Sequence, residues 1–224
     1  ESYVAGLEAL HEQEHAGSSN ANVNYEYNEE ECILGATELM GDHMLFSLSA
    51  QQVLAGLGSG TTAEKAKSLN DSMLAMDQTM ELFYQHKGLT ENASEAINRV
   101  PSQHLNIRYM RMFAGAFMYA AGDHIGIGYG SAGDLAKGTP VSMLSDEADT
   151  NGLYGWGIAH EIGHNMDKLG RTEITNNLYS LMVQSYDGGD MTSLTTRLES
   201  EDRYSAIFQK VAEARPGAAI RRGR

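Results

Sequence analysis

The sequence predicts an α+β fold that is mostly helical and carries a small mixed sheet. Three patterns lead to this prediction. Apolar residues recur with helical spacing between residues 66 and 83, which is typical of a long helix with one buried face. Apolar and polar residues alternate around residues 44–48, and apolar residues alternate with glycine at residues 125–129. Both of these stretches are predicted to form strands.

Composition narrows the classes of partner. The 224 residues, 42% of them hydrophobic, are enough for one sizeable core. Acidic residues outnumber basic residues by 30 to 16, which argues against a nucleic acid or an anionic membrane as the partner. No apolar run is long enough to span a bilayer, so no membrane insertion is expected. The single Cys32 excludes an internal disulfide, and the fold is expected to depend on packing.

The first part of the chain is predicted to combine helices with one or two strands. Val4, Leu7 and Leu10 occupy one face of an amphipathic helix near the N-terminus. The alternation at residues 44–48 predicts the strands. Ser49 is then expected to cap a short helix with the sequence "AQQVLAGL".

The best-defined predicted helix lies between residues 61 and 88. Thr61 and Glu64 have the spacing of a capping box, and Gly88 is placed to end the helix. Its apolar stripe favours a face packed on the core over the alternative of a pliable, methionine-rich binding groove. The stripe consists of Ala66, Leu69, Met73, Met76, Met80 and Phe83.

The amino-acid composition changes near residue 100, where glycine becomes frequent. We therefore expect two parts: residues 1–99, with the helices and strands described above, and residues 100–224, with the chemically reactive side chains. In the second part, "HIGIGYG" at residues 124–130 predicts a strand with one bare face, because every second side chain is missing. Such a face allows another segment to approach closely.

Two stretches contain the pattern His-Glu-x-x-His, at residues 11–15 and 160–164. On a helix, residues four apart lie on one face about 5–6 Å apart, so two imidazoles there can converge on one Zn²⁺ ion. The glutamate after the first histidine is rotated away from the ion and can act as a general base. The pattern is therefore typical of zinc-dependent hydrolases.

The surroundings of the two stretches favour the second one. Uncharged residues flank His160 and His164, so their helix can be buried, as a zinc site with dry surroundings requires. Gly163, between the two histidines, is expected to be a point of close packing. The first stretch lies on a helix crowded with glutamates, and His11 and His15 are expected to lie on a solvated surface.

A catalytic zinc ion needs a third protein ligand, and Glu173 is the best candidate. It opens a new predicted helix eight residues beyond His164, after an expected N-cap at Thr172. Asp167 competes for this role, but it follows His164 on the same helix and is too near to complete a tetrahedron. Two weaker candidates lie in a glycine-rich turn, Asp187 and Asp190.

Four residues beyond Glu173, on the same face of that helix, lies Asn177. Its side chain is placed to hydrogen-bond a ligand histidine and so to fix the tautomer of the ring. An equally weighted alternative is that Asn176 and Asn177 are polar residues of the helix surface.

The combination of "GWGIAHEIGHNMD" and "RTEITNNLYSL" resembles the enhancin-type gluzincin metallopeptidases, which include viral enhancing factors and bacterial, mucin-directed enzymes. Upstream stretches, among them "LNDSMLAMDQTMELFYQHKGLT" and "HIGIGYG", resemble the clostridial branch of this family, so the resemblance covers about residues 24–186. It implies a zincin-like catalytic domain in which His160, His164 and Glu173 bind Zn²⁺ and Glu161 is the general base.

The resemblance also implies an extracellular enzyme, secreted or on the cell surface. Such an enzyme hydrolyses peptide bonds in mucin-type, O-glycosylated glycoproteins, next to a glycosylated Ser or Thr. Related catalytic domains continue well beyond the zinc site, whereas this chain ends soon after "AIFQKVAEARPG". Part of the substrate cleft is therefore expected to be missing. Two other functions stay open: a broad-specificity secreted protease of the thermolysin type, and a zinc-bearing glycoprotein-binding module without turnover.

Several residues are candidates for contact with the substrate. The strand around "HIGIGYG" is hypothesised to be the sheet edge that lines the cleft, where a peptide would add as a strand and the bare face would accommodate a sugar. Alternatively, its glycines pack against the helix at residues 156–167. Trp156 is a candidate to stack on a sugar ring, although a tryptophan before a buried helix more often belongs to the core. The candidate hydrogen-bond donors to the oxyanion are His124, Tyr129, Tyr179 and Tyr186.

Overall fold

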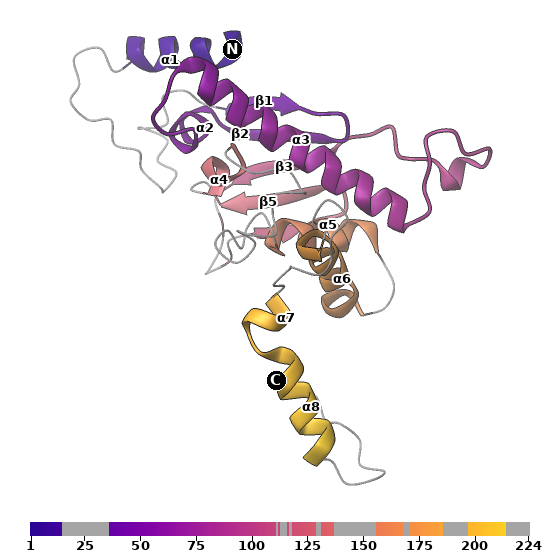
Figure 1. The fold of residues 1–224 in the computed structure, drawn as a ribbon. Coiled ribbons are helices and arrows are strands. Elements are labelled where there is room, and N and C mark those ends of the chain that lie inside the picture. The colour runs from indigo at the N-terminus through magenta and orange to yellow at the C-terminus, as the bar shows by residue number, and fades with distance from the viewer. Residues whose placement is uncertain are drawn as a thin grey trace.

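The computed structural model describes residues 1–14, 36–110, 112, 116, 118–128, 131–136, 156–167, 171–185 and 197–213. These residues form the predicted α+β fold, in which helices pack on a five-stranded mixed sheet (Figure 1). The helices are α1 (Ser2–Glu14), α2 (Ala50–Gly56), α3 (Thr62–His86), α4 (Ala132–Ala136), α5 (Ile158–Met166), α6 (Thr172–Ser185), α7 (Arg197–Ser200) and α8 (Arg203–Glu213), with a 3-10 turn at Ala96–Asn98. The strands are β1 (Ala36–Met40), β2 (Met44–Ser49), β3 (Leu105–Met110), β4 (Met118–Ala120) and β5 (His124–Gly128).

The sheet has the strand order β1-β2-β3-β5-β4. β1 and β2 pair antiparallel, β2, β3 and β5 run parallel, and β4 returns antiparallel to β5. The predicted glycine-alternating strand is β5, which lies between β3 and β4, so the prediction that it forms the edge of the sheet is wrong. The edge beside it is β4. The β2–β3 pairing joins residues on both sides of position 100 into one sheet.

The bare face of β5 is occupied by side chains of the neighbouring strands. A Cβ atom at Gly126 would overlap the ring of Tyr119 and lie 2.6 Å from Sδ of Met110. Tyr119 stands directly opposite Gly126 in the β4–β5 pair. The space beside Gly126 is therefore filled by these side chains. At this position both interpretations of the glycine are wrong, the one that leaves room for a sugar and the one that packs it against the helix at residues 156–167. The glycine makes room for the tyrosine ring.

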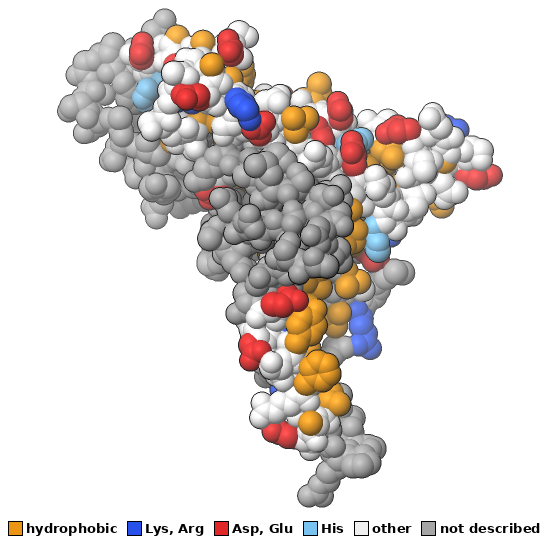
Figure 2. Space-filling view, in the orientation of Figure 1, with side chains coloured by type: hydrophobic (Ala, Val, Ile, Leu, Met, Phe, Trp, Pro, Cys, Tyr) orange, Lys and Arg blue, Asp and Glu red, His pale blue; other side chains and the backbone are white. Residues whose placement is uncertain are grey.

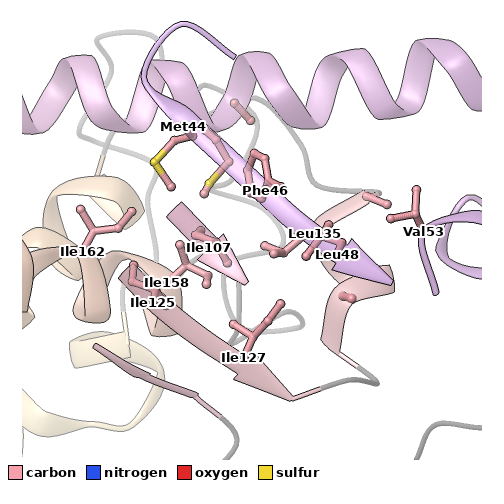
Figure 3. Close-up of a cluster of buried hydrophobic side chains, with 14 of the residues drawn as sticks. Met44, Phe46, Leu48, Val53, Ile107, Ile125, Ile127, Leu135, Ile158 and Ile162 are labelled. Carbon is pink, nitrogen blue, oxygen red and sulfur yellow. The ribbon is translucent and has the colours of Figure 1, made fainter. Parts of the chain in front are cut away.

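The opposite face of the sheet carries the hydrophobic core. Phe46, Ile107 and Ile125 are neighbours across β2, β3 and β5, and all three are buried. Figure 3 shows them in the same cluster as Ile158 and Ile162 of α5, with a long helix crossing above the strands. The core therefore anchors α5 against the sheet.

The helices of the N-terminal half begin and end largely where the sequence predicts. Ser49 caps α2 by accepting a hydrogen bond from the backbone N–H of Gln52 at 3.3 Å. Thr61 and Glu64 form the predicted capping box of α3, and Gly88 follows its end with a positive φ of 72°. These signals are local, which is why the sequence is sufficient to place them.

The buried faces of α1 and α3 agree in part with the predicted patterns. In α1, Val4 and Leu7 are buried, but Leu10 is 49% exposed, so its assignment to the buried face is wrong. The α3 stripe packs into the core and does not form a binding groove. Leu69, Met76, Met80 and Phe83 are buried, and Ala66 and Met73 are partly buried against the same cluster.

The helix α8 differs from the others because its apolar face is exposed. Figure 2 shows hydrophobic side chains gathered along this helix in the lower part of the view. They are Tyr204, Ile207, Phe208 and Val211, with exposed fractions between 47% and 72%. A search of the described helices for a segment able to span a bilayer found none.

Candidate metal centre

The short helix α5 carries His160, Glu161 and His164. Ile158, Ala159 and Ile162 are buried, which fixes the helix against the core. The two histidines are half-buried and lie four residues apart, so both rings point to the same side of the helix. Their ring centroids are 4.9 Å apart, and the ring planes are nearly perpendicular.

The helix α6 packs closely on α5 because Gly163 has no side chain. A Cβ atom at this position would lie 2.8 Å from Cβ and 2.9 Å from Cα of Asn176. The prediction that Gly163 is a point of close packing is therefore confirmed. A second link between the helices is a hydrogen bond of 2.9 Å from the Ser180 hydroxyl to the carbonyl of Trp156.

The first turn of α6 brings a carboxylate to the two histidines. The helix begins at Thr172, and Glu173 is its second residue. The carbonyl of Arg171 accepts the first two helical hydrogen bonds, at 2.9 and 3.0 Å. Arg171 is therefore the N-cap, one residue before the predicted Thr172.

His160, His164 and Glu173 converge in space. Glu173 Oε2 lies 3.4 Å from Nε2 of His160, and Glu173 Oε1 lies 3.4 Å from Nε2 of His164. Two ligand atoms that each lie about 2.0–2.1 Å from a tetrahedral Zn²⁺ ion are about 3.4 Å apart, so the spacing fits such an ion. Potential ligand atoms of these three residues lie within 4.8 Å of one another, and Asp167 does not belong to the cluster.

Two asparagines of α6 contact the histidine rings. Oδ1 of Asn177 lies 2.7 Å from Nδ1 of His160, the contact that the spacing of the sequence suggests. Nδ2 of Asn176 lies 2.9 Å from Nε2 of His160 and 2.8 Å from Nε2 of His164. Asn176 is 1% exposed, so it is not a residue of the helix surface.

Glu161 lies on a different side of α5 and is only 9% exposed. Burial raises the pKa of its carboxyl group, and the negative charge of Glu173 acts in the same direction. Both histidines and a hydrogen bond from the backbone N–H of Ala120 oppose this rise in pKa. The carboxyl group is therefore held by the edge strand β4 in surroundings that favour uptake of a proton.

A cleft of about 460 Å³ opens beside these groups. One wall is β4 with the turn that follows it, and the other wall holds the two histidines, Glu161 and Glu173. The prediction that an edge strand lines the cleft is confirmed for β4. Of the predicted substrate contacts, neither His124 nor Trp156 is among the described residues that line it.

The remaining predicted site residues lie elsewhere or outside the described residues. His124 contacts the hydroxyl of Tyr119, which lines the cleft, at 3.0 Å. Tyr179 is 1% exposed and packs edge-on against Phe83 and His86 of α3, so its candidacy as an oxyanion donor is wrong. Burial raises the pKa of Tyr179 to about 12. Outside the described residues lie His15, Tyr129, Tyr186, Asp187 and Asp190.

Sequence reasoning missed two contacts of this site. Asn176 is three residues beyond Glu173, and helical spacing alone places residues three apart on neighbouring positions of one face. That signal was present but did not separate Asn176 from a surface residue. The contact of Ala120 with Glu161 had no signal, because these two residues belong to segments far apart in the chain.

Residues 60–212, more than half of the chain, match the family described as Peptidase M60, enhancin and enhancin-like. The chain belongs to this peptidase family. A search of curated proteins found no match. The match covers α3 together with the helices and strands that build the cleft.

Several solved structures have a similar fold. The ZmpB metallopeptidase from Clostridium perfringens matches with a TM-score of 0.60 and 22% identity over 90% of this chain and 32% of that chain. The M60 catalytic domain of ZmpC from the same organism, in complex with the sialyl T antigen, matches with a TM-score of 0.57 and 23% identity, over 90% and 32%. A functionally unknown conserved protein from Bacillus anthracis matches with a TM-score of 0.59 and 21% identity, over 80% and 33%. This chain therefore spans about a third of these proteins, and the likeness shows the zincin-like fold.

Proposed function

We propose that the protein is a zinc metallopeptidase that hydrolyses peptide bonds in mucin-type, O-glycosylated glycoproteins. The observation that carries the proposal is the convergence of His160, His164 and Glu173 beside the buried carboxyl group of Glu161. Membership of the M60 family supports a metal-dependent peptidase. Zn²⁺ bound by these three residues would supply a Lewis acid that polarises the scissile carbonyl and lowers the pKa of the attacking water.

The role assigned to Glu161 is that of general base and then general acid. Because burial raises its pKa, this carboxylate is a better proton acceptor than an exposed one. It takes a proton from the attacking water and returns it to the amine that leaves. Asn177 accepts a hydrogen bond from Nδ1 of His160 and so directs Nε2 of that ring toward the metal position.

The peptide is proposed to lie along β4. This strand forms the edge of the described sheet and also holds Glu161 through the N–H of Ala120, so an added strand would pass the general base. β5 cannot take this role, because it lies in the interior of the sheet. His124, which contacts the cleft residue Tyr119, stays a candidate for substrate binding, together with Trp156 and Tyr129.

The substrate class has support from the relatives. The ZmpC catalytic domain has the same fold and is in complex with the sialyl T antigen, a glycan. A glycan subsite on this fold agrees with a peptidase that requires a sugar on its substrate. Because mucin-type glycoproteins are extracellular, we also propose that the protein acts outside the cell, secreted or on the cell surface.

The test is mass spectrometry of the products from a defined O-glycopeptide incubated with the protein. We expect cleavage next to the glycosylated residue, no cleavage with a chelator, and recovery after Zn²⁺ is added. The variant Glu161→Gln should keep its zinc content but lose about 10²–10⁴-fold in kcat, the contribution typical of a general base. Zinc content is measured on the same samples.

Two further substrates separate the proposed function from its alternatives. Removal of the sugar from the glycopeptide should abolish cleavage, and equal rates with and without the sugar would refute glycan dependence. Cleavage of casein at the rate of the glycopeptide would favour the thermolysin-type protease. Binding of the intact glycopeptide without products, in zinc-loaded protein, would favour the binding module.

A further inference from the structure

Asn176 occupies a special position between the two histidine rings. It lies on α6 one turn after Glu173, is 1% exposed, and has its Nδ2 within 2.8–2.9 Å of both Nε2 atoms. A side-chain amide nitrogen has two hydrogens, so it can donate one hydrogen bond to each ring. Both lone pairs that would bind a metal ion therefore face the same amide group.

The neighbouring amide decides which ring nitrogen of His160 carries the proton. Nδ2 of Asn177 donates to the backbone carbonyl of Glu173 at 3.0 Å, which directs Oδ1 of Asn177 to Nδ1 of His160 at 2.7 Å. An amide oxygen only accepts hydrogen bonds, so Nδ1 must carry the hydrogen. In a neutral imidazole, Nε2 of His160 is then an acceptor. Its nearest polar neighbour then has to be a donor, which is Nδ2 of Asn176 at 2.9 Å, whereas Oε2 of Glu173 lies farther away at 3.4 Å.

The same amide sets the tautomer of His164. Within the described part of the chain, His164 has no side-chain hydrogen bond at Nδ1, and its ring interacts with Asn176, Glu173 and His160. A histidine side chain without such constraints favours the tautomer with the proton on Nε2. Donation from Asn176 to Nε2 requires the opposite tautomer, with the proton on Nδ1.

We propose that Asn176 is a positioning residue that keeps both histidines in the tautomer able to bind a metal ion through Nε2. The ring nitrogen that binds a metal must be unprotonated, and the second nitrogen then carries the proton. Asn176 selects this state at both rings and aims the two lone pairs at one point. Each Nε2 has one lone pair, which cannot accept a hydrogen bond and bind a metal ion at the same time. A metal ion that binds therefore replaces the two hydrogen bonds from Asn176.

The packing of α5 on α6 explains why Asn176 reaches both rings. Gly163 leaves the space in which the Cα and Cβ atoms of Asn176 lie, 2.9 and 2.8 Å from the position of a Cβ at this glycine. The inference rests on the metal centre of the proposed function, but not on peptidase activity. Its test therefore measures which nitrogen of each histidine ring carries the proton, and not the turnover of a substrate.

The test is NMR of protein labelled with ¹⁵N-histidine and treated with a chelator, at a pH where both rings are neutral. The ¹⁵N shifts of His160 and His164 should show the proton on Nδ1 in both rings. In Asn176→Asp, which has nearly the same shape, the carboxylate can only accept, so His164 should lose the Nδ1–H tautomer as its dominant form and carry its proton on Nε2. Asn70→Asp changes an exposed asparagine of α3 and should leave both rings unchanged.

The wild-type spectrum is decisive by itself, since a proton on Nε2 of His164 in the chelated protein overturns the inference even if the variant does not fold. An unchanged tautomer of His164 in a folded Asn176→Asp variant overturns it as well. Titration with Zn²⁺ should then leave the Nδ1 proton of wild-type His164 in place and shift its Nε2 resonance. Failure of the protein to bind Zn²⁺ would count against the proposed function, whereas the tautomers in the chelated protein would still test the role of Asn176.

Discussion

The helix α5 carries the whole pattern His-Glu-x-x-His, whereas α1 carries only the first four residues of the same pattern, and the surroundings of the two helices differ. In α5, Ile158 and Ile162 are buried, and α6 packs against the motif and supplies Glu173. In α1, Val4 and Leu7 pack on the core, but Glu8 makes polar contacts, with Nζ of Lys65 at 2.6 Å and with the hydroxyl of Thr62 at 2.7 Å. His15 lies outside the described residues.

The comparison shows that the motif alone supplies two imidazole rings and a neighbouring carboxyl group, whereas the third residue of the candidate metal site comes from a second helix. The approach of α6 depends on Gly163, which lies inside the motif of α5. The corresponding interior positions of the first motif are Gln13 and Glu14. The first motif therefore has no glycine at either interior position.

The largest expected effect is a difference in zinc affinity between histidine variants of α5 and of α1. His164→Ala should weaken zinc binding on the order of 100-fold or more, because loss of groups that merely support a ligand already costs about 10–100-fold. The matched variant His11→Ala should leave zinc affinity unchanged. Competition with a chromophoric chelator measures both affinities. Equal losses in the two variants would mean that the N-terminal motif takes part in the metal centre.

A smaller effect is expected on the free energy of unfolding when a glycine of α5 or of α1 is replaced by alanine. Gly163→Ala should lower the free energy of unfolding by about 1–3 kcal/mol, because the new methyl group overlaps Asn176. Gly6→Ala in α1 meets nothing within 4 Å and should raise stability by about 0.5–1 kcal/mol through helix propensity. Urea denaturation of both variants measures the two free energies. A neutral Gly163→Ala would show that α5 and α6 can separate without cost.

The smallest expected effect concerns two glutamates whose pKa values shift in opposite directions. Burial raises the pKa of Glu161, so the stability it contributes falls as pH rises from the ordinary carboxyl pKa through the raised one. Glu161→Gln should therefore be more stable than the wild type at neutral pH in the presence of a chelator, and this gain should vanish in acid.

Hydrogen bonds from Lys65 and Thr62 lower the pKa of Glu8, so its contribution has the opposite dependence on pH. It is present above the ordinary carboxyl pKa and is lost as pH falls through the lowered one. Glu8→Gln should lower Tm slightly at neutral pH and not in acid. Thermal unfolding across this pH range compares the two variants. The same sign of change in both would contradict the assigned surroundings.

Much of the local structure could be read directly from the amino acids. The caps of α2 and α3, the strand β2 and the buried stripe of α3 follow from interactions between residues a few positions apart. The choice between the two motifs also needed only the apolar or acidic character of neighbouring residues. The short spacing between His164 and Glu173 limited how far apart these side chains can lie.

Other features of the fold and of the site are determined by tertiary packing and could not be predicted from the sequence. The position of β4 at the edge and the burial of Tyr179 and Asn176 depend on segments far apart in the chain. The place of Tyr119 over Gly126 depends on how β4 pairs with β5, the next strand. Periodicity shows which face of an element is apolar, but the free energy of pairing and packing selects its neighbour. For this reason the sequence was sufficient to predict His160, His164 and Glu173 as candidate ligands. The contact of Asn176 with both rings became visible only in the packing of α5 on α6.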